Sequence, residues 1–315
     1  MNDNFIYLYF SNEIIRNYEC FQAGSKRALS ANAFMVLLLA AYKSAWCADC
    51  FDIKDYNKFT NTTEHSKYIK NTLNLNDRNY ADAIRMLVKN NLMYKVKKDV
   101  YLINPWIASH GDTEEIRKYR QYCYDNNIFG TPNLQGRAVT TAEEQKILNA
   151  ELTKDVAKQK HVCVYVDNIA NFSCFTGEFD EKRLNITELV LFFLFATYSK
   201  FVKFPNSIVL NNVIDNSTQE LEKIAEMLQL KKRAVQYAIQ HLTEVNLLHK
   251  IESEHGKYIV NPFLTAKGKK EVIKAFQVSL FKSGSYFNNF STGDLMYDNN
   301  LIINLKTGET KVDLR

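Results

Sequence analysis

One stretch of this sequence occurs twice, and it constrains the fold more than any other feature. Residues 101–107 read Tyr-Leu-Ile-Asn-Pro-Trp-Ile, and residues 258–264, 157 positions later, read Tyr-Ile-Val-Asn-Pro-Phe-Leu. A similar helical segment precedes each copy, Leu73-Asn-Leu-Asn-Asp-Arg78 in the first case and Leu228-Gln-Leu-Lys-Lys-Arg233 in the second. Such internal similarity predicts one structural unit written twice.

The length and composition agree with two globular units. A chain of 315 residues suits two domains of ordinary size, and its 46% of hydrophobic residues can supply a core for each. Glycine and proline are scarce, at ten and four residues, while runs compatible with a helix are long. The composition therefore predicts a mainly α (α+β) protein with short strands.

Hydrophobic periodicity and capping residues define the elements expected in the first unit. In order, they are a strand at Phe5–Phe10, an apolar helix at Ala31–Ser44 capped by Ser30, helices at Thr63–Leu73 and Asp77–Asn90, and strands at Leu92–Val96 and Val100–Ile103. The buried face of the third helix is expected at Tyr80, Ala83, Ile84, Leu87 and Val88. Residues 45–62 are predicted to be irregular.

The second unit repeats this order. It has a strand at Val162–Asn168, an apolar helix at Leu189–Lys200 with a capping box at Asn185 and Glu188, a helix ending at Leu228, a helix at Lys231–Val245 and a hairpin. The buried face of its third helix is expected at Val235, Ala238, Ile239 and Leu242. Residues 201–216 are predicted to be irregular, residues 265–283 helical, and residues 301–314 a terminal hairpin.

The order helix, short helix, tight turn, helix and two-stranded hairpin is typical of a winged helix. The predicted fold is therefore a tandem repeat of two winged-helix domains, at residues 1–125 and 161–283. A helical connector at residues 126–160 joins them, and a C-terminal tail with a hairpin follows at residues 284–315. Charged helices at 113–124 and 141–158 occupy the connecting region and are expected to space the two domains.

A winged helix places the helix after the turn in a DNA major groove and its hairpin wing along the backbone or minor groove. Arg, Lys, Asn and Gln can read base edges, and cations bind phosphates. In the second unit the candidates are Lys231, Lys232, Arg233, Gln236 and Gln240 on the helix, with Lys250 and Lys257 in the wing. In the first they are Asn76, Arg78, Asn79 and Arg85, with Lys95, Lys97 and Lys98 in the wing. Asp77 and Asp82 on the first helix either select cytosine or mark a weaker reader.

The positive charge of the chain is concentrated in these duplicated segments. Residues 73–120 hold nine Lys and Arg against six Asp and Glu, and residues 228–275 hold nine against four. Together these two windows carry +8, whereas the whole chain carries +5. This distribution favours contact with a polyanion through both repeats.

The segments around the doubled stretch resemble a known family. Leu92-Met-Tyr-Lys-Val with Tyr101-Leu-Ile-Asn-Pro-Trp, and Leu247-Leu-His-Lys-Ile with Tyr258-Ile-Val-Asn-Pro-Phe, are similar to the wing and following segment of plasmid replication proteins of the Firmicutes RepL type. More loosely, they resemble tandem winged-helix plasmid initiators. The resemblance covers about fifty residues in each half. It implies origin recognition on a plasmid or phage, although RepL-type chains contain one such unit and this chain contains two.

Other chemistry finds little support in the sequence. Cys47 and Cys50 have the spacing of a metal knuckle, but no second pair accompanies them, so no metal site is predicted. The six histidines include no His-apolar-His pair of the kind that a rolling-circle initiator needs, and no phosphate-binding glycine loop is present. The sequence therefore predicts a protein that is not an enzyme and uses no cofactor.

The expected setting is the cytoplasm. Six cysteines without a disulfide framework indicate a reducing compartment, and no signal peptide or span of about 20 apolar residues is evident. Double-stranded DNA is the expected partner, with host replication proteins as further partners and no membrane. A transcriptional regulator and a winged-helix protein-interaction scaffold remain as alternatives, and the sequence does not fix the oligomeric state.

Overall fold

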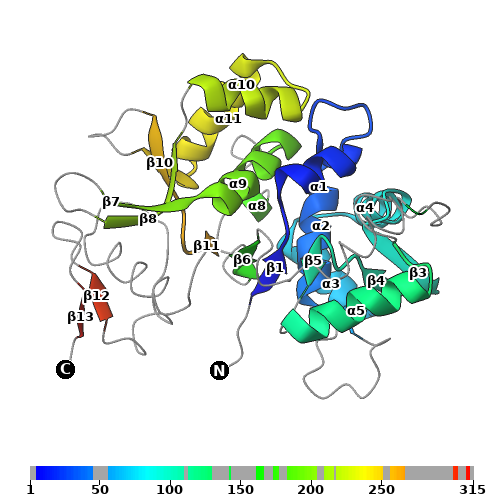
Figure 1. Ribbon diagram of the computed structural model, residues 1–315. Coiled ribbons are helices and arrows are strands. Elements are labelled where there is room, and N and C mark those ends of the chain that lie inside the picture. The colour runs from blue at the N-terminus through cyan, green and yellow to red at the C-terminus, as the bar shows by residue number, and fades with distance from the viewer. Residues whose placement is uncertain are drawn as a thin grey trace.

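The fold mixes α-helices with small antiparallel sheets (Figure 1). The computed structural model describes residues 5–44, 56–109, 113–129, 142, 161–166, 173–176, 183–203, 209–215, 218–250, 256–266, 301–303 and 310–312. The paired cysteines at positions 47 and 50, the predicted helix at 141–158 and most of the predicted connector and C-terminal tail lie outside these residues, as does most of the predicted helix at 265–283.

The elements of the first half appear again, in nearly the same order, in the second. The first half contains β1 (Ile6–Leu8), α1 (Asn12–Asn17), the 3-10 turn η1 (Glu19–Phe21), α2 (Ala31–Tyr42), β2 (Lys58–Thr60), α3 (Thr63–Thr72), α4 (Asp77–Lys89), β3 (Met93–Lys97), β4 (Val100–Ile103), β5 (Ala108–Ser109) and α5 (Thr113–Asp125). The second half contains β6 (Val162–Val164), α8 (Ser173–Thr176), α9 (Ile186–Tyr198), β7 (Lys200–Lys203), β8 (Val209–Asp215), α10 (Thr218–Met227), α11 (Lys232–Glu244), β9 (Leu248–Lys250), β10 (Lys257–Val260) and β11 (Thr265–Ala266). The terminal hairpin pairs β12 (Leu301–Ile303) with β13 (Thr310–Val312), as predicted.

The two central helices begin where their capping residues predict. The Ser30 hydroxyl accepts a hydrogen bond from the amide of Ala33, and every residue from Ala33 to Ala41 in α2 is buried. Asn185 and Glu188 form the predicted capping box at the start of α9, which is buried over most of its length. Helices that are apolar on all sides can be stable only inside a domain, and both lie at the centre of the molecule (Figure 1).

Three predictions about irregular and helical segments are wrong. Residues 58–60 in the first half and 200–203 and 209–215 in the second form strands β2, β7 and β8. Each contains residues that favour strands, such as Phe59 and Val202, but the Lys, Asn and Asp beside them obscure the alternation, so pairing with a neighbouring strand decides their structure. Thr265 and Ala266 also form a strand, where a helix was expected to begin, because β11 pairs with β6.

Each half contains a small sheet with the same strand order. In the first, β4 lies between β2 and β3, and in the second, β10 lies between β8 and β9, with β7 added outside β8. Lys95 pairs with Tyr101 across the first hairpin, and Lys250 pairs with Tyr258 across the second. The hairpins therefore keep the same register relative to the doubled stretch.

A second sheet joins the two halves around a local two-fold axis. Its order is β11-β6-β1-β5, in which β1 corresponds to β6 and β5 to β11. Ile6 pairs with Val164, Leu8 pairs with Val162, and Tyr7 pairs with Cys163 at the centre. The first residue of each strand thus faces the last residue of the other, as a two-fold axis through the central pair requires. The contacts to the outer strands repeat this symmetry. The backbone amide of Tyr9 donates to the Ile107 carbonyl, and the backbone amide of Tyr165 donates to the Leu264 carbonyl, both at 2.9 Å. Within this sheet the two halves are therefore related as the subunits of a two-fold dimer are, and we call this arrangement a pseudo-dimer.

The halves also share one hydrophobic core. Helix α4 packs on α2, α11 packs on α9, and α2 packs on α9. The rings of Phe34 and Phe193, on the two central helices, lie 5.6 Å apart between centroids, within a cluster of buried residues drawn from both halves. Direct contact thus fixes the relative position of the repeats, where the sequence suggested spacing by a connector.

Helix α5 belongs to the first half and does not bridge the two. Its Ile116, Tyr119 and Cys123 pack in a separate cluster with Tyr9 and Trp106. Arg120 is only 2% exposed; its Nε donates to the Pro105 carbonyl at 3.2 Å, and its guanidinium lies 4.7 Å from the centre of the Tyr9 ring. This helix therefore covers the first copy of the doubled stretch.

The asparagine of the doubled stretch has a structural role in both repeats. The side-chain oxygen of Asn104 accepts from the amide of Trp106, and that of Asn261 accepts from the amide of Phe263, both at 3.0 Å. The side-chain amides donate to the carbonyls of Asn91 and Asn246, the left-handed residues just after α4 and α11. Asn-Pro therefore ends the strand and turns the chain in each half, and Trp106 and Phe263 pack inside.

We expect three of the cysteines to resist alkylation in the native protein. Burial raises the pKa of the Cys20, Cys123 and Cys174 thiols to about 12, so almost none of each is thiolate at pH 8. Peptide mapping after iodoacetamide treatment should find them unmodified, in contrast to the half-buried Cys163, and should find all four modified in urea. Native labelling of the three at the rate of Cys163 would contradict this burial.

Candidate nucleic-acid interface

A helix, a tight turn and a second helix occur at matching places in the two repeats. Between α3 and α4, Asn74 has a positive φ of 51°, and the amide of Leu75 donates to the Lys70 carbonyl at 2.9 Å. Between α10 and α11, Gln229 has a φ of 56°, and the amide of Leu230 donates to the Ala225 carbonyl at 2.8 Å. The same turn geometry therefore sets the angle at which the second helix leaves the first.

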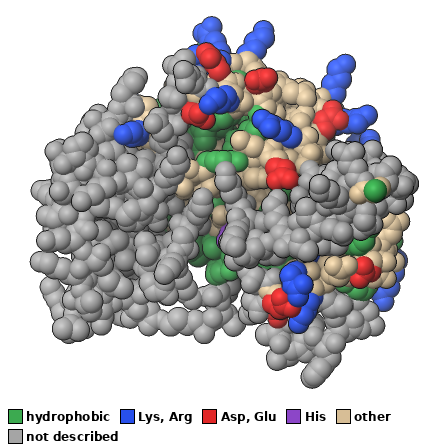
Figure 2. Space-filling model, viewed as in Figure 1, with side chains coloured by type: hydrophobic (Ala, Val, Ile, Leu, Met, Phe, Trp, Pro, Cys, Tyr) green, Lys and Arg blue, Asp and Glu red, His purple; other side chains and the backbone are tan. Residues whose placement is uncertain are grey.

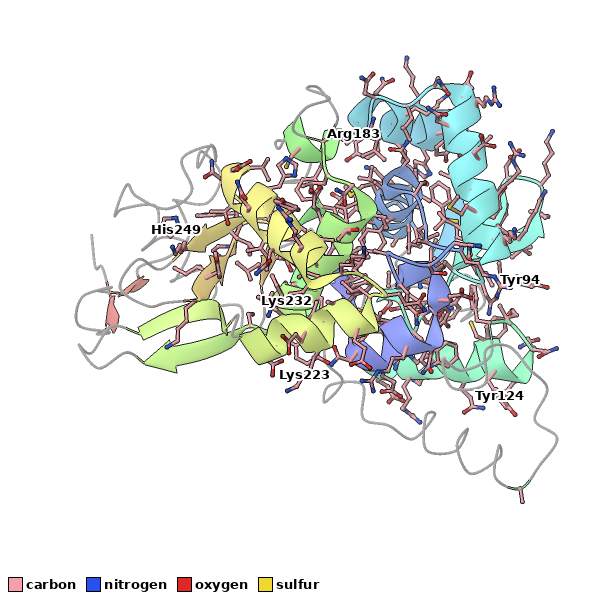
Figure 3. All side chains as sticks on the ribbon, turned by 90° about the horizontal axis from the view of Figure 1, so that it is seen from above. Tyr94, Tyr124, Arg183, Lys223, Lys232 and His249 are labelled. Carbon is pink, nitrogen blue, oxygen red and sulfur yellow. The ribbon has the colours of Figure 1, made fainter. Side chains whose placement is uncertain are left out.

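The second helix of each pair presents a polar face opposite its core. Helix α4 buries Tyr80, Ala83, Ile84 and Leu87, and α11 buries Val235, Ala238, Ile239 and Leu242, all as predicted. Of the predicted set only Val88 is half-buried. In Figure 3 the two helices lie on either side of the central pair α2 and α9. The residues predicted to contact DNA lie on the surfaces that these helices leave outside.

On the first repeat the predicted side chains are all exposed, but they are not equivalent. Asn76 caps α4, with its side-chain oxygen accepting from the amide of Asn79 at 2.8 Å. Arg85 forms an ion pair with Asp82 on the same helix. Arg78, two turns before Arg85, forms no ion pair with any described residue. Asn76 therefore has a capping role and Arg85 is held by Asp82, whereas Arg78 is available to a ligand.

On the second repeat, Lys231 and Arg233 are exposed at the start of α11, while Lys232 forms an ion pair with Glu222 of α10 at 2.9 Å (Figure 3). Gln236 is exposed, and Gln240 donates to Glu244 at 2.9 Å. Arg233 has no acidic partner among the described residues. It takes the same position on α11 as Arg78 takes on α4, the second residue of the helix.

The wings differ in how many cations they expose. In the first, Lys95, Lys97 and Lys98 are all exposed, together with Tyr94 and Val96 on strand β3. In the second, Lys250 is exposed and Lys257 is half-buried, while residues 251–255 at its tip lie outside the described part of the chain. The first wing thus compensates in charge for the acidic residues on its helix.

Acidic side chains stand among these cations. Figure 2 shows Lys and Arg side chains along the upper edge, over α10 and α11, interspersed with Asp and Glu. On α10, Glu220 pairs with Lys223 at 2.9 Å, in addition to the Glu222 contact with Lys232. Along α10 and α11, the exposed cations without an acidic partner among the described residues are therefore Lys231 and Arg233, both at the start of α11.

Sequence reasoning missed two contacts that shape the second helix. Tyr237 is exposed on α11 and contacts Arg233 four residues earlier, a spacing visible in the sequence. Glu188, buried on α9, contacts His241 Nδ1 on α11 at 2.8 Å and fixes this helix against the core. The positions that correspond in the first half are Ala33 and Met86. There the Met86 sulfur accepts a hydrogen bond from the Ser30 amide at 3.3 Å, so each repeat has its own polar contact between this helix and the start of its central helix.

Comparison with known proteins returns no counterpart. No family model, curated protein or solved structure matches this chain. Within the described part of the chain, no helix is both long and apolar enough to cross a bilayer, and no three His, Cys, Asp or Glu side chains gather as metal ligands would. The geometry of the two halves is therefore what bears on function.

Proposed function

We propose that the chain is a tandem winged-helix protein that binds double-stranded DNA in a sequence-specific way, as the replication initiator of a plasmid or phage. Each repeat contains a helix, a strand, two helices joined by a tight turn, and a hairpin. The second strand of the hairpin, β4 or β10, lies between the first hairpin strand and the strand that precedes the two helices. That order and strand arrangement support the winged-helix assignment. The helices after the turn, α4 and α11, are the proposed readers.

One observation carries the proposal. Arg78 and Arg233 occupy the same position at the start of the two reader helices, and both are exposed without an acidic partner among the described residues. Residues at the start of a recognition helix contact base edges, and arginine is the side chain best suited to guanine. The repetition of an arginine without an acidic partner at that position supports the same role for both helices.

The local two-fold axis adds a geometric expectation. Two readers related by a two-fold axis run in opposite directions, as in a dimeric repressor, and such a pair suits two half-sites in inverted orientation. Because the halves share a sheet and a core, the spacing of the half-sites should be fixed. The resemblance to RepL-type proteins supports a role in initiation, whereas a transcriptional regulator would differ in its target site; a plasmid-maintenance assay separates the two.

A salt titration of duplex binding tests the proposal. If about five of the exposed cations contact phosphates, the logarithm of the association constant should fall with the logarithm of salt concentration at a slope of about −4 to −5. Lys97→Ala in the first wing should weaken binding to all duplexes alike and reduce the magnitude of this slope by about 1. Glu64→Ala, an exposed change on α3 away from the readers, serves as the control. Absence of duplex binding at low salt would favour a protein-interaction scaffold instead.

A further inference from the structure

Tyr237 is the most exposed large hydrophobic side chain among the described residues, with 56% of its surface accessible. It lies on the outer face of α11, one turn after Arg233. The ring lies outside the cluster of buried residues. Exposed among the polar side chains of the proposed reader face, it is accessible to a ligand bound there.

The contact between Tyr237 and Arg233 orients the arginine. Arg233 Nε donates to the tyrosine hydroxyl at 2.9 Å, and the guanidinium carbon lies 5.4 Å from the ring centre. Using Nε in this way leaves the two terminal nitrogens of the guanidinium to donate elsewhere. Those two nitrogens form the pair that binds O6 and N7 of guanine in the major groove.

The corresponding position in the first repeat has different chemistry. Asp82 stands where Tyr237 stands in the second, and it pairs with Arg85 instead of with Arg78. Arg78 therefore lacks the support that Arg233 has. Holding a flexible arginine in its binding geometry before the ligand arrives reduces the entropy lost on binding. The second reader is thus the preorganised one.

We propose that Tyr237 is a specificity-determining residue: it holds Arg233 toward a guanine in the second half-site and applies its ring to the methyl group of a nearby thymine. The inference rests on the proposed function and specifies the sequence class that the second reader takes. Residues 233 and 237 are separated by about 6 Å along the helix, while successive bases lie about 3.4 Å apart. The ring therefore falls one or two base pairs from the guanine, where an apolar surface selects thymine.

The test is a selection from a randomised duplex library by the full-length wild type, Tyr237→Phe and Tyr237→Ala, followed by affinity measurements on the selected site. The wild type should select a guanine with a thymine one or two positions away, and replacing this guanine should weaken binding by roughly 5-fold to 100-fold. Replacing that thymine by uracil, which lacks only the methyl group, should weaken wild-type binding by about 4-fold.

The variants separate the two roles of Tyr237. Tyr237→Phe keeps the ring and loses the hydroxyl, so it should retain the difference in affinity between thymine and uracil and lose part of the preference for guanine. Tyr237→Ala should lose the thymine-to-uracil difference entirely and most of the guanine preference. Glu64→Ala, an exposed change on α3 of the first repeat, should leave both preferences intact. If Tyr237→Ala selects the same site with the same discrimination as the wild type, the inference is wrong although the proposed function stands. If the wild type binds no duplex at low salt, the proposed function fails and the inference with it.

Discussion

A Gly24→Ala variant should be less stable than the wild type by about 3 kcal/mol, because the added methyl group cannot fit between the two halves. Gly24 lies after η1 and donates its amide to the Leu228 carbonyl at 2.9 Å. A Cβ atom at this position would lie 1.9 Å from the carbonyl oxygen of Gln229 and 2.7 Å from its carbonyl carbon. Both atoms belong to the backbone of the turn between α10 and α11, so no side chain can rotate away. Urea denaturation followed by circular dichroism measures the loss.

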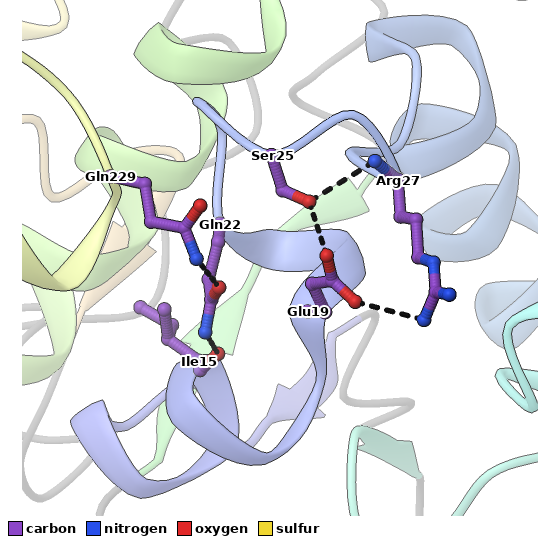
Figure 4. Close-up of polar contacts among 6 residues, drawn as sticks. All are labelled: Ile15, Glu19, Gln22, Ser25, Arg27 and Gln229. Atoms are coloured by element: carbon purple, nitrogen blue, oxygen red, sulfur yellow. Dashed lines mark hydrogen bonds and ion pairs between the residues drawn. The ribbon is translucent and has the colours of Figure 1, made fainter.

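The control for this variant removes a contact at the same place without adding an atom. Gln229 donates to Gln22 through their side chains, and Gln22 donates to the Ile15 carbonyl (Figure 4). Gln22→Ala should cost less than about 1 kcal/mol, because these groups are not fully buried and water can replace the lost partners. Equal stability of Gly24→Ala and the wild type would show that the halves can separate here without cost.

The local elements of this fold were predictable because their signals are local. The two apolar helices, their capping residues and the buried faces of α4 and α11 follow from spacing and side-chain type alone. Strands β2, β7 and β8 were not predictable in this way. Each mixes Phe, Val or Ile with Lys or Asn over a few residues, a pattern too short to indicate a strand, and nothing in those residues identifies the partner strand that stabilises it.

The arrangement of the halves also required the structure. The sequence shows that Ile6–Leu8 and Val162–Val164 correspond, but it does not show that they pair with each other. Either strand could equally have remained at the edge of its own half. Since the pair is central to the four-stranded sheet, this one contact converts two separate units into a pseudo-dimer. It also implies that the two proposed readers move together.

For the candidate interface, the sequence identified the residues but not which of them are held by other side chains. All fourteen predicted side chains lie outside the core, yet Lys232 and Arg85 are held by acidic neighbours and Asn76 caps a helix. These differences depend on which side chains meet in space. Glu222 reaches Lys232 from the preceding helix, ten positions away, and no helical spacing rule relates the two. The contact between Arg233 and Tyr237, in contrast, has the four-residue spacing that sequence reasoning can use.

Asn104→Ala and Asn261→Ala should each lower the stability of the whole chain, by about 3 and about 2 kcal/mol respectively. Asn104 is buried, and its loss leaves the Asn91 carbonyl and the Trp106 amide without this partner, as well as removing a bond of 3.1 Å to the Tyr18 hydroxyl. Asn261 makes the two equivalent backbone contacts. An unsatisfied buried polar group costs about 1–3 kcal/mol. Asn79→Ala, on the exposed face of α4, should change stability by no more than about 0.5 kcal/mol.

The shape of the unfolding curve tests the shared core more directly than the size of the losses. If the halves were independent domains, each variant would lower one transition and leave a second unchanged. Because buried residues of both halves form one cluster, we expect a single transition that both variants move to lower urea concentration. The two sites lie in different halves and share no partner, so the double variant should lose about the sum of the single losses. A curve with two steps, only one of them shifted by Asn261→Ala, would refute the pseudo-dimer and leave two linked domains in its place.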